Sequence, residues 1–257
     1  MFSYRMTLIG LAVLVFSVQG FEDSAFGQGR KVLLTTKDHY QISGTLTEPS
    51  GQATASAVVL LHMFKQTKES WAPLLGPLAA NGITSLAIDM RGHGDSRIGP
   101  DGSDNSIRME GRDSSLFKLM SKDAEAAVRY LIDQGANVNR IGLVGASVGC
   151  SVALQVVAEG GVPIRAVVLM TPGTEYLGLR SLDDLRKWPA RALPLLILSS
   201  REEAAKGALA IYQPRRDKGA ELKLFDQQQI HGTYMFGEVD GMEELIATWL
   251  AAKLQGS

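Results

Sequence analysis

The sequence contains a single cysteine, Cys150, among 257 residues. One cysteine cannot form an intramolecular disulfide, so the hydrophobic core must supply the stability of the fold. Cys150 lies in an apolar stretch after a glycine-rich turn, a position typical of a buried packing residue rather than a reactive thiol. Because no cysteine stands near the N-terminus, a lipid anchor on an N-terminal cysteine is excluded.

The chain also lacks an excess of charge of either sign. It has 26 basic and 27 acidic residues. Three of these charges, Arg5, Glu22 and Asp23, fall in the first 27 residues, which leaves 25 of each sign in the rest. A basic surface for nucleic acid is therefore absent, and we expect no nucleic-acid partner.

No apolar run reaches the roughly 20 residues that span a bilayer. The longest run covers residues 6–18, follows Arg5, and is succeeded by small residues at Gly20 and Gly27. This order is typical of a signal peptide that is cleaved after one of the two glycines. We therefore expect residues 1–27 to be a signal peptide and the protein to be secreted or periplasmic, in contact with a membrane only if the leader stays uncleaved.

Two kinds of apolar pattern alternate along the remaining chain. Short apolar runs are typical of strands that are buried on both faces of a parallel sheet; they cover residues 57–61, 83–88, 141–144, 166–170 and 195–198, and residues 221–225 predict a further strand. Helical spacing occurs between and after them, at 71–80, 117–131, 147–159, 204–212 and 242–250. Residues 31–36 and 40–47 predict an opening hairpin. The alternation predicts an α/β fold with helices on both faces of the sheet.

Neither an internal repeat nor a shift in composition marks a second domain, so we expect one domain over residues 28–257. The two longest connections, 96–115 and 171–194, both follow the carboxyl ends of predicted strands. Open α/β sheets bind ligands at that edge. The second connection is too short for a large cap domain, and the first is too polar for a wide apolar lid.

A G-x-S-x-G pattern at residues 145–149 places Ser147 between a predicted strand and a predicted helix. Alone the pattern is weak, because glycine is frequent in this chain. In this context it is typical of a nucleophile elbow, a strained turn that exposes the serine at the end of the sheet. The alternative is a glycine-rich turn in which the serine only caps the helix.

A serine hydroxyl needs a base to become a nucleophile, and the base needs a third group to orient it. Three of the four histidines, His39, His62 and His93, precede Ser147. In this architecture the order along the chain is serine, acid, histidine. His231, in the loop before the final helix, is therefore the candidate base.

The acid is expected at the end of the strand that lies between serine and histidine. The strand at 195–198 leads to Glu203, which is our first choice, and to Glu202 beside it. Glu175, after the preceding strand, is a third candidate. The sequence leaves these alternatives open, and each of the glutamates could instead be a solvated loop charge.

Hydrolysis of an acyl group also requires donors for the developing oxyanion. The backbone N–H of Val148, directly after the nucleophile, is one candidate. The second is expected in the loop after the strand at 57–61, where we favour the N–H of Phe64. His62, in the same loop, is then interpreted as a residue that positions the loop.

Together these segments resemble the α/β-hydrolase superfamily over nearly all of residues 28–257. The matching pieces are residues 60–62, 89–96, 140–149 and 231–233. The resemblance implies an eight-stranded, mostly parallel sheet, a Ser-acid-His triad, no cofactor and a structural role for His93. In size and layout the small single-domain serine esterases and the dienelactone-hydrolase-like enzymes are the most similar members. Two features depart from many relatives: Met63 stands where they have glycine, and the acid is a glutamate.

The expected function is therefore the hydrolysis of carboxylic esters of small-molecule acyl substrates through an acyl-enzyme. A peptidase, a thioesterase or a lactone hydrolase would use the same residues. A non-catalytic binding member of the fold is a further alternative, which the complete set of Ser147, His231 and strand-end carboxylates disfavours. No metal site is expected, and the oligomeric state is left open.

Overall fold

The computed structural model describes residues 29–50, 55–189, 192–228 and 230–256. The expected signal peptide at residues 1–27 lies outside the described residues. Within the described part of the chain, no helix has the length and apolar character needed to cross a membrane.

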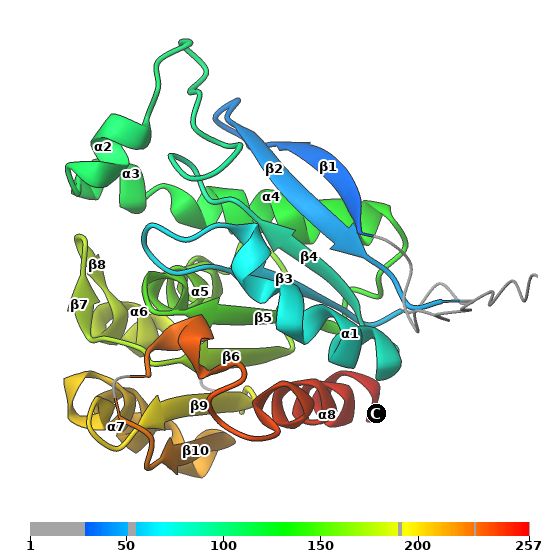
Figure 1. Cartoon of the computed structure of the whole chain (residues 1–257), viewed down its shortest axis with the longest axis vertical. Coiled ribbons are helices and arrows are strands. Elements are labelled where there is room, and N and C mark those ends of the chain that lie inside the picture. The colour runs from blue at the N-terminus through cyan, green and yellow to red at the C-terminus, as the bar shows by residue number, and fades with distance from the viewer. Residues whose placement is uncertain (1–28, 51–54, 190–191, 229, 257) are drawn as a thin grey trace, which may run out of the picture.

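An eight-stranded sheet forms the centre of the fold, with the strand order β1-β2-β4-β3-β5-β6-β9-β10 (Figure 1). Strand β2 is antiparallel to both of its neighbours, and the other neighbouring strands are parallel. The expected eight-stranded, mostly parallel sheet and its opening hairpin are confirmed. The strand bounds are Arg30–Thr35 (β1), Gln41–Thr47 (β2), Ala57–Leu61 (β3), Thr84–Ile88 (β4), Ile141–Ala146 (β5), Ala166–Met170 (β6), Leu195–Ser200 (β9) and Ala220–Phe225 (β10).

Helices cover both faces of the sheet, because the central strands are apolar on both sides (Figure 1). In β3, Val58 and Leu60 pack into the core beneath α1 (Ala72–Ala80) and α8 (Met242–Gln255). The alternate residues of β3 pack into the opposite core beneath α4 (Met120–Asp133) and α5 (Val148–Glu159). Four of the five helices predicted from apolar spacing, those at 71–80, 117–131, 147–159 and 242–250, therefore cover the sheet as expected.

The two long connections contain short elements that the sequence pattern did not predict. Residues 96–115 include α2 (Ser106–Glu110) and the start of α3 (Ser114–Phe117). Residues 171–194 include the hairpin β7 (Glu175–Tyr176) and β8 (Leu179–Arg180), followed by α6 (Ser181–Lys187). In Figure 1 this hairpin lies at the left, beside the carboxyl ends of the parallel strands.

The prediction of one helix over 204–212 is wrong. The chain forms a 3-10 turn, η2 (Ala204–Lys206), and then a separate helix, α7 (Ala208–Tyr212). The break falls at Gly207, where an added Cβ would lie 2.1 Å from the carbonyl oxygen of Pro172. Gly207 is extended, with φ of −176°, and forms an antiparallel bridge with Gly173, so the helix does not continue through this position. A further 3-10 helix, η3 (Gln213–Lys218), leads into β10.

Candidate active site

The turn between β5 and α5 places Ser147 in a strained backbone conformation with a positive φ of 51° and a ψ of −115°. A Cβ added at Gly145 would lie 2.3 Å from the carbonyl oxygen of Gly149, and one added at Gly149 would lie 2.1 Å from that of Leu61. Both positions of the G-x-S-x-G pattern therefore require glycine. The backbone N–H of Ser147 donates to the carbonyl of Met170 at 3.0 Å, which fixes the turn to the end of β6.

Cys150 lies one turn into α5 and is buried, as the sequence predicted. Its Sγ is 3.1 Å from the carbonyl oxygen of Gly145 and 3.2 Å from that of Met170. Burial raises the pKa of the thiol well above its ordinary value. Cys150 is thus held in the protonated, unreactive form.

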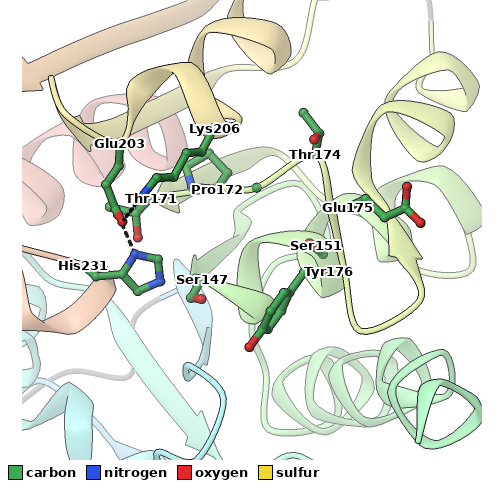
Figure 2. A pocket seen from close by; sticks show the side chains of 11 residues that line it. Ser147, Ser151, Thr171, Pro172, Thr174, Glu175, Tyr176, Glu203, Lys206 and His231 are labelled. Atoms are coloured by element: carbon green, nitrogen blue, oxygen red, sulfur yellow. Dashed lines mark hydrogen bonds and ion pairs between the residues drawn. The ribbon is translucent and has the colours of Figure 1, made fainter. Parts of the chain in front are cut away.

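A pocket of about 500 Å³ opens at the carboxyl edge of the sheet (Figure 2). It brings together three of the predicted site residues, Ser147, Glu203 and His231, which come from three separate connections. Glu175 also lines this pocket. The remaining lining residues are mostly polar: Ser151, Thr171, Pro172, Gly173, Thr174, Tyr176 and Lys206.

The imidazole of His231 is oriented by Glu203. Its Nδ1 lies 2.6 Å from Oε2 of Glu203, a hydrogen-bond distance. Figure 2 shows the other ring nitrogen turned toward Ser147. Within the described part of the chain the hydroxyl of Ser147 makes no hydrogen bond, so the contact between serine and histidine is open in this structure. Catalytic hydrogen bonds are often long in enzymes without substrate.

Glu203 is ionised in this setting. Partial burial acts to raise the pKa of its carboxyl group, but the hydrogen bonds from His231 and from Lys206 outweigh it and hold the pKa below its ordinary value. Nζ of Lys206 lies 3.1 Å from Oε1, so each carboxylate oxygen has one partner. The backbone N–H of Glu203 donates to the hydroxyl of Ser200, at the end of β9, at 3.2 Å.

The other two candidate acids are placed differently. Glu202 is exposed, and the hydrogen bond to His231 is made by its neighbour Glu203. Glu175 begins the hairpin β7–β8, and in Figure 2 its carboxylate points away from His231. Glu202 and Glu203 are adjacent in the loop after β9, and only Glu203 reaches the imidazole of His231.

The loop after β3 is held by His62, which is buried. Its Nδ1 donates to the carbonyl of Met63 at 2.7 Å, and its Nε2 accepts the backbone N–H of Met90 at 3.0 Å. Burial lowers the pKa of His62 to about 3, so the ring is neutral. These contacts fit the predicted loop-positioning role. The ring of His93 packs edge-on at 4.7 Å and is likewise buried, as expected of a structural residue.

Met63 replaces the glycine that is common after this strand, and the backbone tolerates the change. The left-handed residue of this loop is Lys65, with φ of 61°, rather than Met63. The side chain of Met63 is buried against Gly232, where an added Cβ would lie 2.2 Å from its sulfur. The backbone N–H of Phe64 has no hydrogen-bond partner within the described part of the chain, but Phe64 is not among the residues that line the pocket.

A buried ion pair between Lys68 and Asp89, which the sequence analysis did not predict, stabilises the loop after β3. Nζ of Lys68 lies 2.6 Å from Oδ2 of Asp89, and the backbone N–H of Lys68 donates to Oδ1 at 2.8 Å. The exposed carboxylate of Asp95 lies 3.1 Å from the same ammonium group. These bonds join the segment after β3 to the turn after β4. Among the described residues, no cluster of histidine, cysteine or carboxylate side chains is arranged to hold a metal ion.

The family model described as the alpha/beta hydrolase family matches residues 58–252. The chain belongs to the alpha/beta hydrolase family. The resemblance inferred from the strand-end motifs is thereby confirmed, and the eight-stranded sheet is the one that this family implies.

Solved structures share the fold of this alpha/beta hydrolase. An esterase from Pyrococcus furiosus is 20% identical, with 98% of this chain and 100% of that chain covered and a TM-score of 0.69. A cold-adapted esterase from an Arctic intertidal metagenomic library is 22% identical, with coverage of 88% and 94% and a TM-score of 0.66. A dienelactone hydrolase from Anabaena variabilis is 17% identical, with coverage of 89% and 97% and a TM-score of 0.64. No curated protein matches the sequence.

Proposed function

We propose that this alpha/beta hydrolase cleaves carboxylic esters with Ser147 as nucleophile, His231 as base and Glu203 as the acid that orients the base. The observation that carries the proposal is the 2.6 Å hydrogen bond between His231 and Glu203, beside a serine that is held with a positive φ in the turn after β5. A binding module would have no need for an oriented imidazole at this place. The esterases among the structural neighbours support an ester as the substrate.

In the first half of the reaction, rotation of the Ser147 side chain closes its hydrogen bond to Nε2 of His231. The imidazole removes the hydroxyl proton as Oγ attacks the ester carbonyl, and the ionised Glu203 stabilises the imidazolium that forms. The imidazolium then gives its proton to the leaving alcohol. Water repeats the sequence on the acyl-enzyme and releases the acid, after which Ser147 is regenerated.

The developing oxyanion has two backbone donors in this proposal. The N–H of Val148 lies in the first turn of α5, where amides have no partner inside the helix and the helix dipole favours negative charge. The N–H of Phe64 is the second donor. Loss of one such donor lowers turnover by about 100- to 1,000-fold in enzymes of this kind.

The pocket is sized for a small substrate. Its volume of about 500 Å³ is within the range of small-molecule sites. Its lining combines polar side chains with apolar surface, to which Pro172 and Tyr176 contribute. We therefore propose esters of small acids and alcohols as the substrates. Lactones, thioesters and peptide amides are the alternatives to be compared with them.

Export remains part of the proposal. A charged residue, an apolar run of sub-membrane length and small residues at Gly20 and Gly27 support a cleaved leader. Sequencing the N-terminus of the protein recovered from its native host tests this, because a chain that begins at Met1 would contradict cleavage.

A fluorophosphonate probe tests the catalytic assignment, because it labels only a serine that is activated as a nucleophile. We expect labelling of the wild type and of Ser151→Ala, whose serine lines the same pocket but is hydrogen-bonded to Ser181 at 3.0 Å. We expect none for Ser147→Ala and slow labelling for His231→Ala. Labelling that persists in Ser147→Ala would refute the nucleophile. A panel of short esters, long esters, lactones and amides then identifies the substrate class.

A further inference from the structure

Four consecutive residues at the end of β6, residues 170–173, contact all three segments of the proposed triad. We call them the β6 end segment. The carbonyl oxygen of Met170 accepts the backbone N–H of Ser147 at 3.0 Å. The hydroxyl of Thr171 donates to the same carbonyl oxygen at 2.8 Å and accepts the backbone N–H of Gly232, next to His231, at 2.8 Å. A single hydroxyl thus links the nucleophile turn to the histidine loop.

The loop that carries Glu203 contacts the β6 end segment at Pro172 and Gly173. Gly173 forms an antiparallel bridge with Gly207, four residues after Glu203. A Cβ added at Gly207 would lie 2.1 Å from the carbonyl oxygen of Pro172, so the two backbones are in direct contact. The β6 end segment is therefore the part of the chain on which the turn of Ser147, the loop of His231 and the loop of Glu203 meet.

Thr171 adopts a conformation that its residue type disfavours. Its φ is 52°, which is rare for a β-branched side chain. Its side chain is buried, and its backbone N–H donates to the carbonyl of Leu198 at 2.7 Å. Such strain persists only where surrounding contacts over-determine the geometry. The conformation directs the hydroxyl between the carbonyl of Met170 and the amide of Gly232.

We propose that Thr171 is a positioning residue for ester hydrolysis: its hydroxyl fixes the distance between Ser147 and His231. This inference rests on the proposed triad. The serine and the histidine are carried by loops that are 84 residues apart in sequence, and their hydrogen bond is not yet closed in the structure. The Thr171 bridge holds His231 within reach of the serine when substrate binds. An error of about 1 Å in such a placement lowers turnover by about 100-fold.

The substitution Thr171→Val removes the hydroxyl and keeps the shape of the side chain. We expect kcat for a short ester to fall by about 10- to 100-fold with KM nearly unchanged. Thr171→Ser retains the hydroxyl and should restore most of the turnover. Thr36→Val is the matched control, because the hydroxyl of Thr36 is also buried and accepts a backbone N–H, from Tyr40 at 2.9 Å, in the turn between β1 and β2. It should lower the melting temperature and leave kcat unchanged.

Two further readouts separate positioning from general destabilisation. We expect the proton between His231 and Glu203 to give a downfield NMR resonance that broadens in Thr171→Val but not in Thr36→Val. The lower limb of the pH profile of kcat/KM should shift in Thr171→Val alone. If the valine variant does not fold, Thr171→Ala carries the same comparison, because alanine enters the left-handed region more easily.

Two outcomes would refute the positioning role of Thr171. Equal turnover and equal pH profiles in Thr171→Val and wild type would overturn the proposal, as would equal losses in the valine and serine variants. Failure of the triad itself would appear elsewhere, as fluorophosphonate labelling that survives Ser147→Ala. Thr171 can therefore be disproved while the proposed function stands.

Discussion

The buried pair of Lys68 and Asp89 gives a quantitative test of how the loop after β3 is supported. The side chain of Lys68 is 3% exposed and that of Asp89 is 0% exposed. Besides the ammonium group, the carboxylate accepts two backbone N–H groups, from Lys68 at 2.8 Å and from Asp95 at 2.9 Å. No other cation pairs with Asp89 in the described ranges of the chain.

Substitution of Lys68 by methionine keeps most of the buried stem and removes the charge. The carboxylate of Asp89 then remains buried with only its two backbone donors. Removal of one partner from a buried ion pair lowers the free energy of unfolding by about 3–5 kcal/mol. Asp89→Asn should be milder, at about 1–3 kcal/mol, because the ammonium group of Lys68 keeps the exposed carboxylates of Glu69 at 3.0 Å and Asp95 at 3.1 Å.

Urea denaturation of the two single variants and of the double variant measures these losses. The double variant should lose less than the sum of the singles, since neither charge is left unpaired, with a coupling of about 0.5–3 kcal/mol. Lys31→Met is the control: Lys31 pairs with Asp95 at 3.5 Å but is 80% exposed, so its removal should change stability by less than about 1 kcal/mol. A loss for Lys68→Met as small as that of the control, or strict additivity of Lys68→Met and Asp89→Asn, would refute the reasoning.

Three further predictions follow from the site. Glu203→Gln should lower kcat by about 100- to 10,000-fold, whereas Glu202→Gln should stay near wild type; equal losses in steady-state assays would remove Glu203 as the acid. The folded-state pKa of His62, about 3, lies below its ordinary 6.5, so its neutral form stabilises the fold above pH 6.5 and this stability is lost as pH falls toward 3. In urea titrations at several pH values, His62→Gln should remove up to about 1.4 kcal/mol per pH unit of that slope; an unchanged slope would contradict burial of the neutral ring. Gly149→Ala should cost about 1–3 kcal/mol or more in urea, since its Cβ would meet the backbone of Leu61, and wild-type stability would contradict that contact.

The sequence predicted those parts of the fold whose signal is local. Continuous apolar runs located the central strands, because a strand buried on both faces needs apolar residues at every position. The turn around Ser147 could also be predicted, because the backbone approaches Gly145 and Gly149 so closely that both positions require glycine. The two glycines therefore mark the turn in the sequence. His231 followed from chain order alone.

The features that escaped prediction depend on contacts between distant segments. The choice between Glu202 and Glu203 turns on one residue of register, and only the placement of His231 resolves it. The break at Gly207 arises from the approach of Pro172, 35 residues earlier in the chain. Thr171 has no pattern of its own, because its hydroxyl bridges a carbonyl and an amide that come together only in the folded sheet.

Three of the six non-glycine residues with positive φ in the described part of the chain follow neighbouring strands at the edge of the sheet that carries the proposed site. Lys65, Ser147 and Thr171 are non-glycine residues with φ between 51° and 61°, and they follow β3, β5 and β6, which are neighbours in the sheet. Each such conformation costs about 1–3 kcal/mol, a sizeable part of the roughly 5–15 kcal/mol that stabilises a domain. The backbone bonds of Ser147 to Met170 and of Thr171 to Leu198 hold two of the three residues against this strain. A site held by backbone bonds needs little reorganisation when charge develops on the substrate, which is the condition under which backbone donors stabilise an oxyanion most strongly.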